Sequence, residues 1–398
     1  MKKKIALLSQ FGKPIRGLSP YSDSLFAELN KQKNICISQV DYKSPFPSFL
    51  HPAKSESLKQ VGDLSWWNPF SWLRLAKSDF DVVHIQHWLS PMSFYLLPVT
   101  WLSRRNGKKV VVTVHNPEAH EHAFGFRIIE TLFYKYADAI IVHTENSANS
   151  LRTRTNNKTP VSVIPLGIEF QRQLPLADKY DALDKLGLDK KFNYVLIFGN
   201  LRGYKGIGLL LRAWRVVVLE HPDVKLIIGG RLWTGQDFFS RIGATISGTR
   251  SQSLALAGEL DALVKQEKIL YFPGFLPDEM IDSLVRVSEF CVFPYEKFES
   301  QSAAACRAVG LGSPVLVSNV GGLPDVAIDE SWIVEPRNLD GLISTLNLKI
   351  MASKKGLERV DFSEKFHFMS TSAVAKETAG LYLSLFRKQE SNPAANHL

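Results

Sequence analysis

The sequence predicts an α/β protein built on two parallel sheets, each in its own domain. Dense β-branched runs of strand length alternate with helix-length segments along the chain, as at 81–86, 109–115 and 224–228. Strands that alternate with helices form a parallel sheet covered on both faces. A chain of 398 residues exceeds the length at which one core keeps growing, so two domains are expected.

Composition restricts the partners and the compartment. The formal charge of +9 favours an anionic partner, such as a nucleotide, nucleic acid or acidic lipid, although a solvated basic surface has the same composition. The cysteines are too few for a disulfide framework and lack metal-ligand spacing, which favours a reducing compartment: Cys36, Cys291 and Cys306. The apolar run after the first lysines is too short for a signal peptide, and the longest apolar stretch, 88–102, is interrupted by Ser, Thr and Pro. We therefore expect a cytoplasmic protein without a membrane-spanning segment.

The N-terminal half begins with a strand at 4–9, a loop that contains Gly12 and Gly17, and a helix. Such a loop can place its N–H groups against a phosphate, but a tight turn that requires glycine explains it equally well. Further strands are expected at 139–142 and 161–165.

His115 falls at the carboxyl end of the predicted strand 109–115, where Asn116 and Pro117 end the strand. Catalytic residues gather at this end of parallel sheets. The alternative is a histidine packed beneath the loop.

A tryptophan-rich stretch separates these early strands. Five of the eight tryptophans lie here, with arginines close by: Trp66, Trp67, Trp72, Trp88 and Trp101. Aromatic rings beside basic residues suit an interfacial membrane contact or stacking on sugar rings, while core packing is the ordinary explanation.

A polar segment, 168–190, precedes a second alternating half. Its expected strands are 194–198, 224–228, 269–272, 289–293, 316–318 and 332–334, and its helices 207–219, 247–268 and 277–287. An amphipathic helix, 370–386, and a frayed tail are expected to follow.

The loop GNLRGYKG, residues 199–206, places Arg202 and Lys205 between a strand and a helix, with glycines at both ends. A guanidinium, an ammonium and a helix N-terminus together suit a diphosphate, and a solvated basic turn is the alternative. No Ser or Thr follows the lysine, so this is not a Walker loop.

The stretch 294–326 reads as strand end, polar loop, helix, strand and glycine-rich turn. Ser300 or Ser302 can cap the helix, and Gly310 and Gly312 end it. Glu299 is thereby placed at the mouth of a helix N-terminus.

Several segments in this order resemble the retaining group 1 glycosyltransferases. They are GLSPYSDSL, VVTVHN, ADAIIVHTENSANSL, VSVIPLG, FGNLRGYKGIGLLLRAW, ILYFPGFLPDEMIDSLV and GSPVLVSNVGGLPD. The resemblance implies the GT-B fold, with two Rossmann-like domains facing across a cleft. The implied boundaries are 1–168 for the acceptor-side domain, 169–190 for a linker, 191–361 for the nucleotide-sugar domain, and 362–398 for a helix that crosses back plus the tail.

The resemblance also implies how the donor's diphosphate is held. Gly17 would offer its N–H to the donor phosphate across the cleft. Gly199 would let the backbone approach the donor, and Arg202 and Lys205 would hold the diphosphate. No metal is implied, and no cofactor beyond the nucleotide-sugar co-substrate.

The same resemblance places other residues near the sugar. His115 would lie beside the transferred sugar, and Glu299 matches the first glutamate of a paired motif near the sugar's hydroxyls. Ser300, Gln301 and Ser302 replace the usual Gly-aromatic-Gly that approaches the donor.

The sequence departs from the family at two positions. Arg307 stands where the second glutamate of the pair accepts hydrogen bonds from the ribose, and an arginine cannot accept any. Asn200 replaces an arginine, so Arg202 must supply that cation. The expected function is retaining transfer of a sugar from a nucleotide diphosphosugar to a hydroxyl, and the alternative that Arg307 favours is a non-catalytic GT-B binding protein.

A third hypothesis, a nucleotide-sugar epimerase on the same fold, ranks below these two because the motifs resemble those of transferases. Only the net charge favours a nucleic-acid partner. The expected acceptor is a sugar, a polysaccharide or a lipid-linked molecule, with a peripheral membrane contact that would place the protein at the inner face of the membrane.

Overall fold

The protein forms two compact α/β units in the computed structural model, which describes residues 2–12, 18–44, 64–117, 124–171, 176–232, 258–355 and 362–390. The first unit comprises residues 1–167 and 368–398, and the second comprises residues 168–367. Each unit has one sheet in which all the strand pairs are parallel. The predicted α/β class with two parallel sheets is therefore confirmed.

The first unit contains a seven-stranded sheet in the order β3-β2-β1-β4-β5-β6-β7. Its strands are β1 (Lys3–Ser9), β2 (Ile35–Ser44), β3 (Leu64–Ser65), β4 (Val82–His87), β5 (Lys109–Val114), β6 (Ala139–Val142) and β7 (Val161–Val163). Its helices are α1 (Leu18–Asn30), α2 (Pro69–Lys77), α3 (Ser93–Arg105), α4 (Phe124–Tyr136), α5 (Glu145–Thr155) and α13 (Thr371–Glu390).

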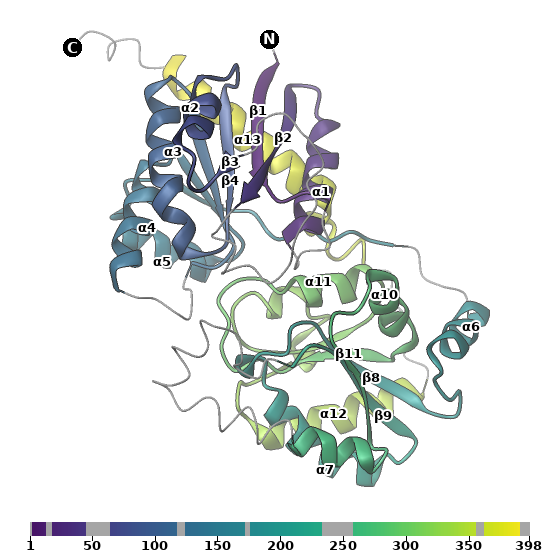
Figure 1. The fold of residues 1–398 in the computed structure, drawn as a ribbon. Coiled ribbons are helices and arrows are strands. Elements are labelled where there is room, and N and C mark those ends of the chain that lie inside the picture. Colours follow the sequence, from purple (N-terminus) through teal and green to yellow (C-terminus); the bar gives the residue numbers. More distant parts are fainter. Residues whose placement is uncertain are drawn as a thin grey trace. The chain divides into compact units, whose positions relative to one another are not determined.

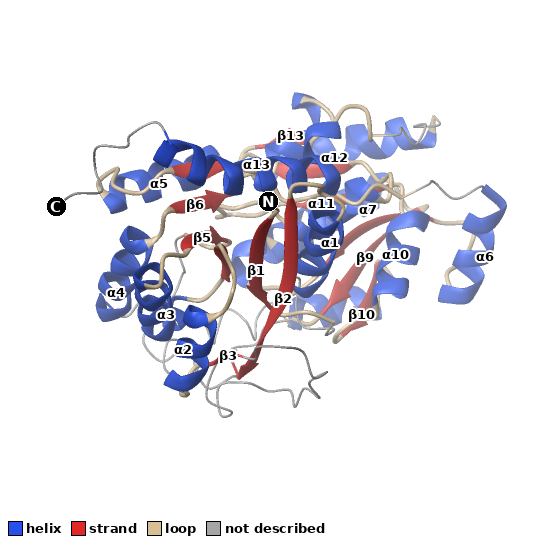
Figure 2. Ribbon diagram, turned by 90° about the horizontal axis from the view of Figure 1, so that it is seen from above, coloured by secondary structure: helices blue, strands red, loops and turns tan. Residues whose placement is uncertain are grey.

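Residues of β1 alternate between the two faces of this sheet. Ile5 and Leu7 belong to the core beneath α1 and α13, whereas Ala6 and Leu8 belong to the core beneath α2 to α5. Figure 2 shows the two helix layers on opposite faces of the strands. A strand buried on both faces is rich in apolar residues, which explains why β1 and β5 were recognisable in the sequence.

The second unit contains a six-stranded sheet in the order β10-β9-β8-β11-β12-β13. Its strands are β8 (Asn193–Phe198), β9 (Val224–Gly230), β10 (Ile269–Pro273), β11 (Phe290–Phe293), β12 (Val315–Ser318) and β13 (Ile333–Val334). Its helices are α6 (Leu176–Leu186), α7 (Ile207–Glu220), α10 (Asp278–Val287), α11 (Ala303–Gly310) and α12 (Leu339–Lys354), with α7 and α12 on one face and α10 and α11 on the other (Figure 1).

Strands β2 and β3 were not among the expected strands. In β2 the apolar Ile35, Ile37 and Val40 are separated by polar residues, and the next strand outward, β3, has two residues. Near the edge of a sheet, a strand needs fewer apolar residues than a central strand needs. The search for dense apolar runs in the sequence therefore missed both β2 and β3.

Candidate functional site

The candidate site of the second unit lies where its strand order changes direction. β8 lies between β9 and β11, so the chain leaves neighbouring strands β8 and β11 through the loops 199–206 and 294–302. Ligands of open α/β sheets bind outside the carboxyl ends of the strands at such a switch point. These two loops contain the predicted donor-binding residues of this unit, except Arg307.

Gly199 brings the first loop against the start of α11. Its φ is +113°, and a Cβ at this position would lie 3.3 Å from the Lys205 ammonium nitrogen and 4.0 Å from the Cβ of Ala304. Gly206, with a φ of +69°, packs against the loop that follows β11. A Cβ on Gly206 would lie 1.9 Å from the Pro294 carbonyl oxygen. Both glycines allow the backbone approach that places Lys205 beside the helix N-terminus.

Lys205 is a buried cation. Its Nζ lies 5.1 Å from the centroid of the Tyr295 ring, and within the described part of the chain no residue accepts a hydrogen bond from it. Burial lowers the pKa of the ammonium. Tyr204 opposes this shift, and the positive charge of Arg202 adds a smaller lowering effect. A buried ammonium without a protein counter-ion is a site prepared for an anion.

Arg202 begins the short 3-10 turn that carries Lys205. It is exposed, and the Lys205 backbone N–H donates to its carbonyl at 3.0 Å. The loop therefore carries two cations, and one of them, Lys205, lies near the first turn of α11, whose N–H groups have no partner within the helix.

The second loop is fixed by its own side chains. Ser302 Oγ accepts from the Ala305 N–H at 3.4 Å and lies 3.1 Å from the Tyr295 hydroxyl. The Gln301 amide donates to Asp325 at 2.8 Å, and the Ser300 carbonyl accepts from the Gly322 N–H at 2.9 Å. The side chains of Gln301 and Ser302 thus shape the loop. Glu299, in the same loop, is half-buried.

Arg307 of α11 is held by α10. Its guanidinium donates to Asp278 Oδ1 at 2.6 Å, to the Asp278 carbonyl at 2.8 Å and to Asp282 Oδ1 at 2.8 Å. Both aspartates lie on α10. Arg307 therefore cross-links α10 and α11, and a phosphate contact would have to replace these bonds.

In the first unit, His115 directly follows β5, and its neighbours are other imidazoles and amides. Its Nδ1 lies 3.1 Å from His143 Nε2, and its Nε2 lies 2.7 Å from the Gln86 side-chain oxygen. The Tyr21 ring packs edge-on against it at 5.2 Å. Burial, followed by the nearby histidines, lowers the pKa of His115 well below its usual value, so the ring is neutral. By its exposed surface, His115 is half-buried.

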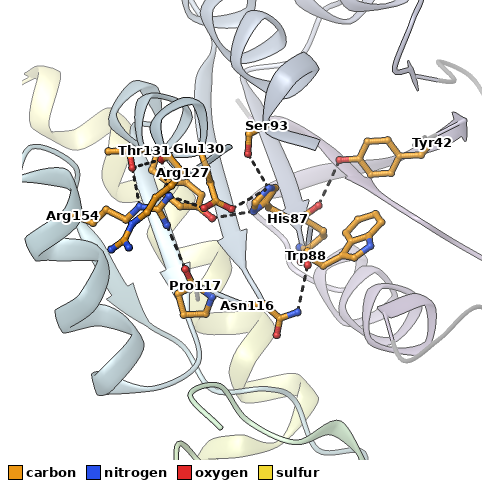
Figure 3. A network of polar contacts seen from close by, with 12 residues as sticks. Tyr42, His87, Trp88, Ser93, Asn116, Pro117, Arg127, Glu130, Thr131 and Arg154 are labelled. Carbon is orange, nitrogen blue, oxygen red and sulfur yellow. Dashed lines mark hydrogen bonds and ion pairs between the residues drawn. The ribbon is translucent and has the colours of Figure 1, made fainter. Parts of the chain in front are cut away.

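A buried ion pair anchors the backbone that follows His115 (Figure 3). Arg154 of α5 donates to Glu130 at 2.6 Å and to the Pro117 carbonyl at 3.3 Å. His87 lies 3.9 Å from the same carboxylate and 3.0 Å from the Tyr134 hydroxyl. This network ties α4 and α5 to the loop that begins at His115.

Some predictions cannot be placed. Gly17 and the loop 118–123 lie outside the described residues. Within the described ranges, no group of three His, Cys, Asp or Glu side chains could hold a metal ion. None of the helices described is long and apolar enough to cross a lipid bilayer.

Models of known protein families match segments in both units. Residues 44–172 match the model described as Glycosyltransferase Family 4, and residues 178–361 match the model for glycosyl transferases group 1. The chain belongs to the group 1 glycosyltransferases. The chain resembles the D-inositol 3-phosphate glycosyltransferase of Mycobacterium sp. strain KMS, with 28% identity over 264 residues, which cover 62% of this chain and 53% of the relative. It thus spans about half the length of the curated relatives that it matches.

Solved structures of glycosyltransferases share the fold. A sucrose-phosphate synthase from Thermosynechococcus elongatus superimposes with a TM-score of 0.70 and 19% identity, covering 97% of this chain and 100% of that one. Anabaena HepE in complex with UDP-glucose gives a TM-score of 0.68 and 14% identity, covering 96% and 99% of the two chains. The fold is therefore GT-B, as the sequence motifs implied.

Sequence reasoning missed one residue beside His115 in the first unit and one beside Gly199 in the second unit of this glycosyltransferase. His143 follows β6 as His115 follows β5, so the same rule could have identified it. Gly230, with a φ of +134°, lies against the carbonyl of Gly199 and marks a backbone contact between neighbouring strands. Its position after an apolar strand was the available signal.

Proposed function

We propose that this protein transfers a sugar, with retention, from a nucleotide diphosphosugar to a hydroxyl acceptor. The observation that carries the proposal is Lys205, a buried ammonium without a hydrogen-bond acceptor among the described residues, beside Gly199 and the first turn of α11. A diphosphate would supply the missing negative charge. The UDP-glucose complex of a protein with this fold supports a nucleotide-sugar donor.

Each residue would have a separate task. Lys205, Arg202 and the α11 N-terminus stabilise the negative charge that develops on the departing diphosphate, which requires no metal. Glu299 contacts hydroxyls of the transferred sugar, because its own charge would repel a phosphate. His115 and Gly17, both in the first unit, keep their proposed roles toward the transferred sugar and the donor phosphate.

The Arg307 geometry bears on the rival proposal, a binding protein with a degenerate donor site. The guanidinium is occupied by Asp278 and Asp282, so it neither accepts from a ribose nor leaves an unpaired charge in the site. The cations that would hold a diphosphate are unaffected by this substitution. This favours the enzyme, in which other groups hold the ribose.

A screen of nucleotide sugars, by thermal shift and then by hydrolysis and transfer assays, tests the proposal. We expect stabilisation by at least one donor, release of its nucleotide, and loss of both in Arg202→Ala/Lys205→Ala, which should retain the wild-type circular dichroism spectrum. Binding without nucleotide release would favour the rival, and unchanged transfer by the double variant would exclude the proposed site.

The acceptor proposed is a polysaccharide or a glycolipid precursor at the inner face of the membrane. Trp67, just before α2, is 63% exposed, and Phe70, within α2, is 80% exposed. The adjoining helix α3 adds the exposed rings of Phe94 and Trp101. Arg105 lies over the Trp101 ring at 5.2 Å. Exposed aromatic rings beside basic residues favour a surface of anionic lipid.

The structure changes the choice of residues for testing this contact. Trp66 and Trp72 pack against the core, so they are unsuitable, whereas Trp67, Phe70 and Trp101 are accessible. Vesicles with anionic lipid should float the wild-type protein, and Trp67→Ser/Phe70→Ser/Trp101→Ser should float less. Leu219→Ser is the matched control, because Leu219 is an exposed apolar residue on α7 of the second unit. Equal flotation of the wild type and the triple variant would exclude this surface.

A further inference from the structure

A continuous row of hydrogen-bonding side chains crosses the first unit from the C-terminal helix to the loop after β7. The Tyr382 hydroxyl of α13 lies 2.5 Å from His84 Nδ1, and His84 Nε2 lies 2.7 Å from Thr113 Oγ1 and 3.4 Å from the Gln86 amide. Gln86 then contacts His115, His115 contacts His143, and His143 Nδ1 lies 2.9 Å from the Ile164 carbonyl oxygen.

The Ile164 end decides the direction of these bonds. A carbonyl oxygen only accepts, so His143 must carry a proton on Nδ1. Burial lowers the pKa of His143 to about 4, so the ring is neutral and its Nε2 has a lone pair. His115 must then donate from Nδ1 to that lone pair, which leaves His115 Nε2 without a proton.

The same reasoning orients Gln86. A bare His115 Nε2 at 2.7 Å requires a donor, so the amide nitrogen of Gln86, rather than its oxygen, faces His115. The two ends of a glutamine amide are exchangeable in assignment. The Gln86 oxygen then faces a protonated His84 Nε2, which donates to Thr113 Oγ1 at 2.7 Å and more weakly to this oxygen at 3.4 Å, and His84 Nδ1 accepts from Tyr382. Every hydrogen bond along the row from Tyr382 now donates toward the Ile164 carbonyl, and all three imidazole rings are neutral.

We infer that His143 and Gln86 are positioning residues that hold His115 as the Nδ1–H tautomer with a lone pair on Nε2. His115 can then accept a hydrogen bond from a substrate hydroxyl when Gln86 gives way, but it cannot donate one from Nε2. The catalytic importance of this tautomer depends on the proposed glycosyl transfer. The tautomer itself does not depend on the proposed function.

Nitrogen-15 NMR of histidine-labelled full-length protein reads the tautomers directly. With signals assigned by single His→Gln variants, neutral His115 and His143 should each show a protonated Nδ1 and an unprotonated Nε2. A protonated Nε2 on neutral His115 would overturn the inference.

Variants test each end of the row. Gln86→Glu places an obligate acceptor beside Nε2, so His115 should acquire a second proton near neutral pH. Gln86→Leu, which introduces no charge, should leave the Nδ1–H tautomer but shift the Nε2 signal as its hydrogen bond is lost. An unchanged His115 signal in folded Gln86→Glu and Gln86→Leu would exclude Gln86 as a positioning residue.

Tyr382→Phe is the matched control, because the direction is set at Ile164 and only the His84 signal should change. His221 of the second unit should be unaffected in every variant. A change of the His115 tautomer in Tyr382→Phe would contradict the argument from Ile164.

Kinetics separate this inference from the proposed function. Gln86→Glu should lower kcat by about tenfold or more while the donor Kd stays within about twofold, because the donor cations lie in the second unit. Rescue of kcat by Gln86→Asn, beyond that of Gln86→Leu, would support a hydrogen-bonding role. If no donor reacts, the proposed function fails while the NMR result still stands. If transfer occurs but wild-type and Gln86→Glu kcat are equal, the positioning role is excluded.

Discussion

A Cβ on Gly199 would lie 3.3 Å from the ammonium nitrogen of Lys205. The two residues are six positions apart in one loop, and the lysine folds back over the glycine at the carboxyl end of β8. A side chain at Gly199 would therefore crowd the ammonium and the first turn of α11, where we propose that an anion binds. Substitution of either residue should affect ligand binding and stability differently.

Lys205→Met should stabilise the ligand-free protein and abolish donor binding. The substitution removes a buried charge without an acceptor among the described residues and keeps most of the volume, so we expect a gain of about 1 kcal/mol in the free energy of unfolding. Urea unfolding measures the gain, and thermal shift with the donor measures the loss. A destabilised variant would indicate that the ammonium has a counter-ion in the free protein.

The same lysine predicts a pH dependence. Its folded-state pKa lies below the ordinary value of 10.5, so between those two pKa values the unfolded chain binds more protons than the folded one. Stability attributable to Lys205 therefore rises as pH increases through this window. The difference in free energy of unfolding between Lys205→Met and wild type should shrink with rising pH. A constant difference would argue against a lowered pKa.

Gly199→Ala should weaken donor binding by about tenfold or more, because the methyl group lies against Lys205 Nζ at a φ of +113°. Isothermal titration with the donor measures this effect. Gly187→Ala is the control for backbone strain, since its φ is +67° and its Cβ would meet nothing within 4 Å. Similar donor affinities for the two variants would exclude a role for the space beside Lys205.

The central strands could be predicted from the sequence because a doubly covered parallel sheet requires continuous apolar runs. Val110, Val111 and Val112 are all fully buried, on both faces of β5. Strand β2, with its alternating polar residues, and the two-residue β3 carry no such requirement. Strand β2 depends on its pairing with β1, and β3 on its pairing with β2, and neither pairing is contained in a local pattern.

The positions of Gly199 and His115 at the carboxyl ends of β8 and β5 were predictable from the sequence. The partners of a side chain were not. Nothing local to Arg307 indicates that it binds Asp278 and Asp282, which lie 29 and 25 residues earlier on another helix. Likewise, the contact of His115 with His143 depends on the pairing of β5 with β6.

Arg307→Ala should reduce stability more than donor affinity. Loss of its bonds to Asp278 and Asp282 should cost about 1 kcal/mol, a modest value because the pair is partly exposed. The donor Kd should stay within about twofold of wild type. A double-mutant cycle with Asp282→Asn gives the coupling energy. A donor affinity that falls more than about tenfold, without a loss of stability, would instead place Arg307 in the donor site.

Arg154→Met should be strongly destabilising because it leaves Glu130, 1% exposed, as a buried carboxylate without its cation. We expect a loss of about 3–5 kcal/mol in the free energy of unfolding, measured in urea. His87 is a weak substitute at 3.9 Å, since burial lowers its pKa to about 4 and keeps it neutral.

Two variants distinguish the buried charge from other effects of losing Arg154. Glu130→Gln/Arg154→Met removes both charges and should recover much of the lost stability. Arg152→Met breaks the exposed pair with Glu145 on the same helix, so it should cost less than about 1 kcal/mol. If the double variant is no more stable than Arg154→Met, the stabilisation comes from the hydrogen bonds of Arg154 to the backbone at Arg127 and Pro117, rather than from neutralising Glu130.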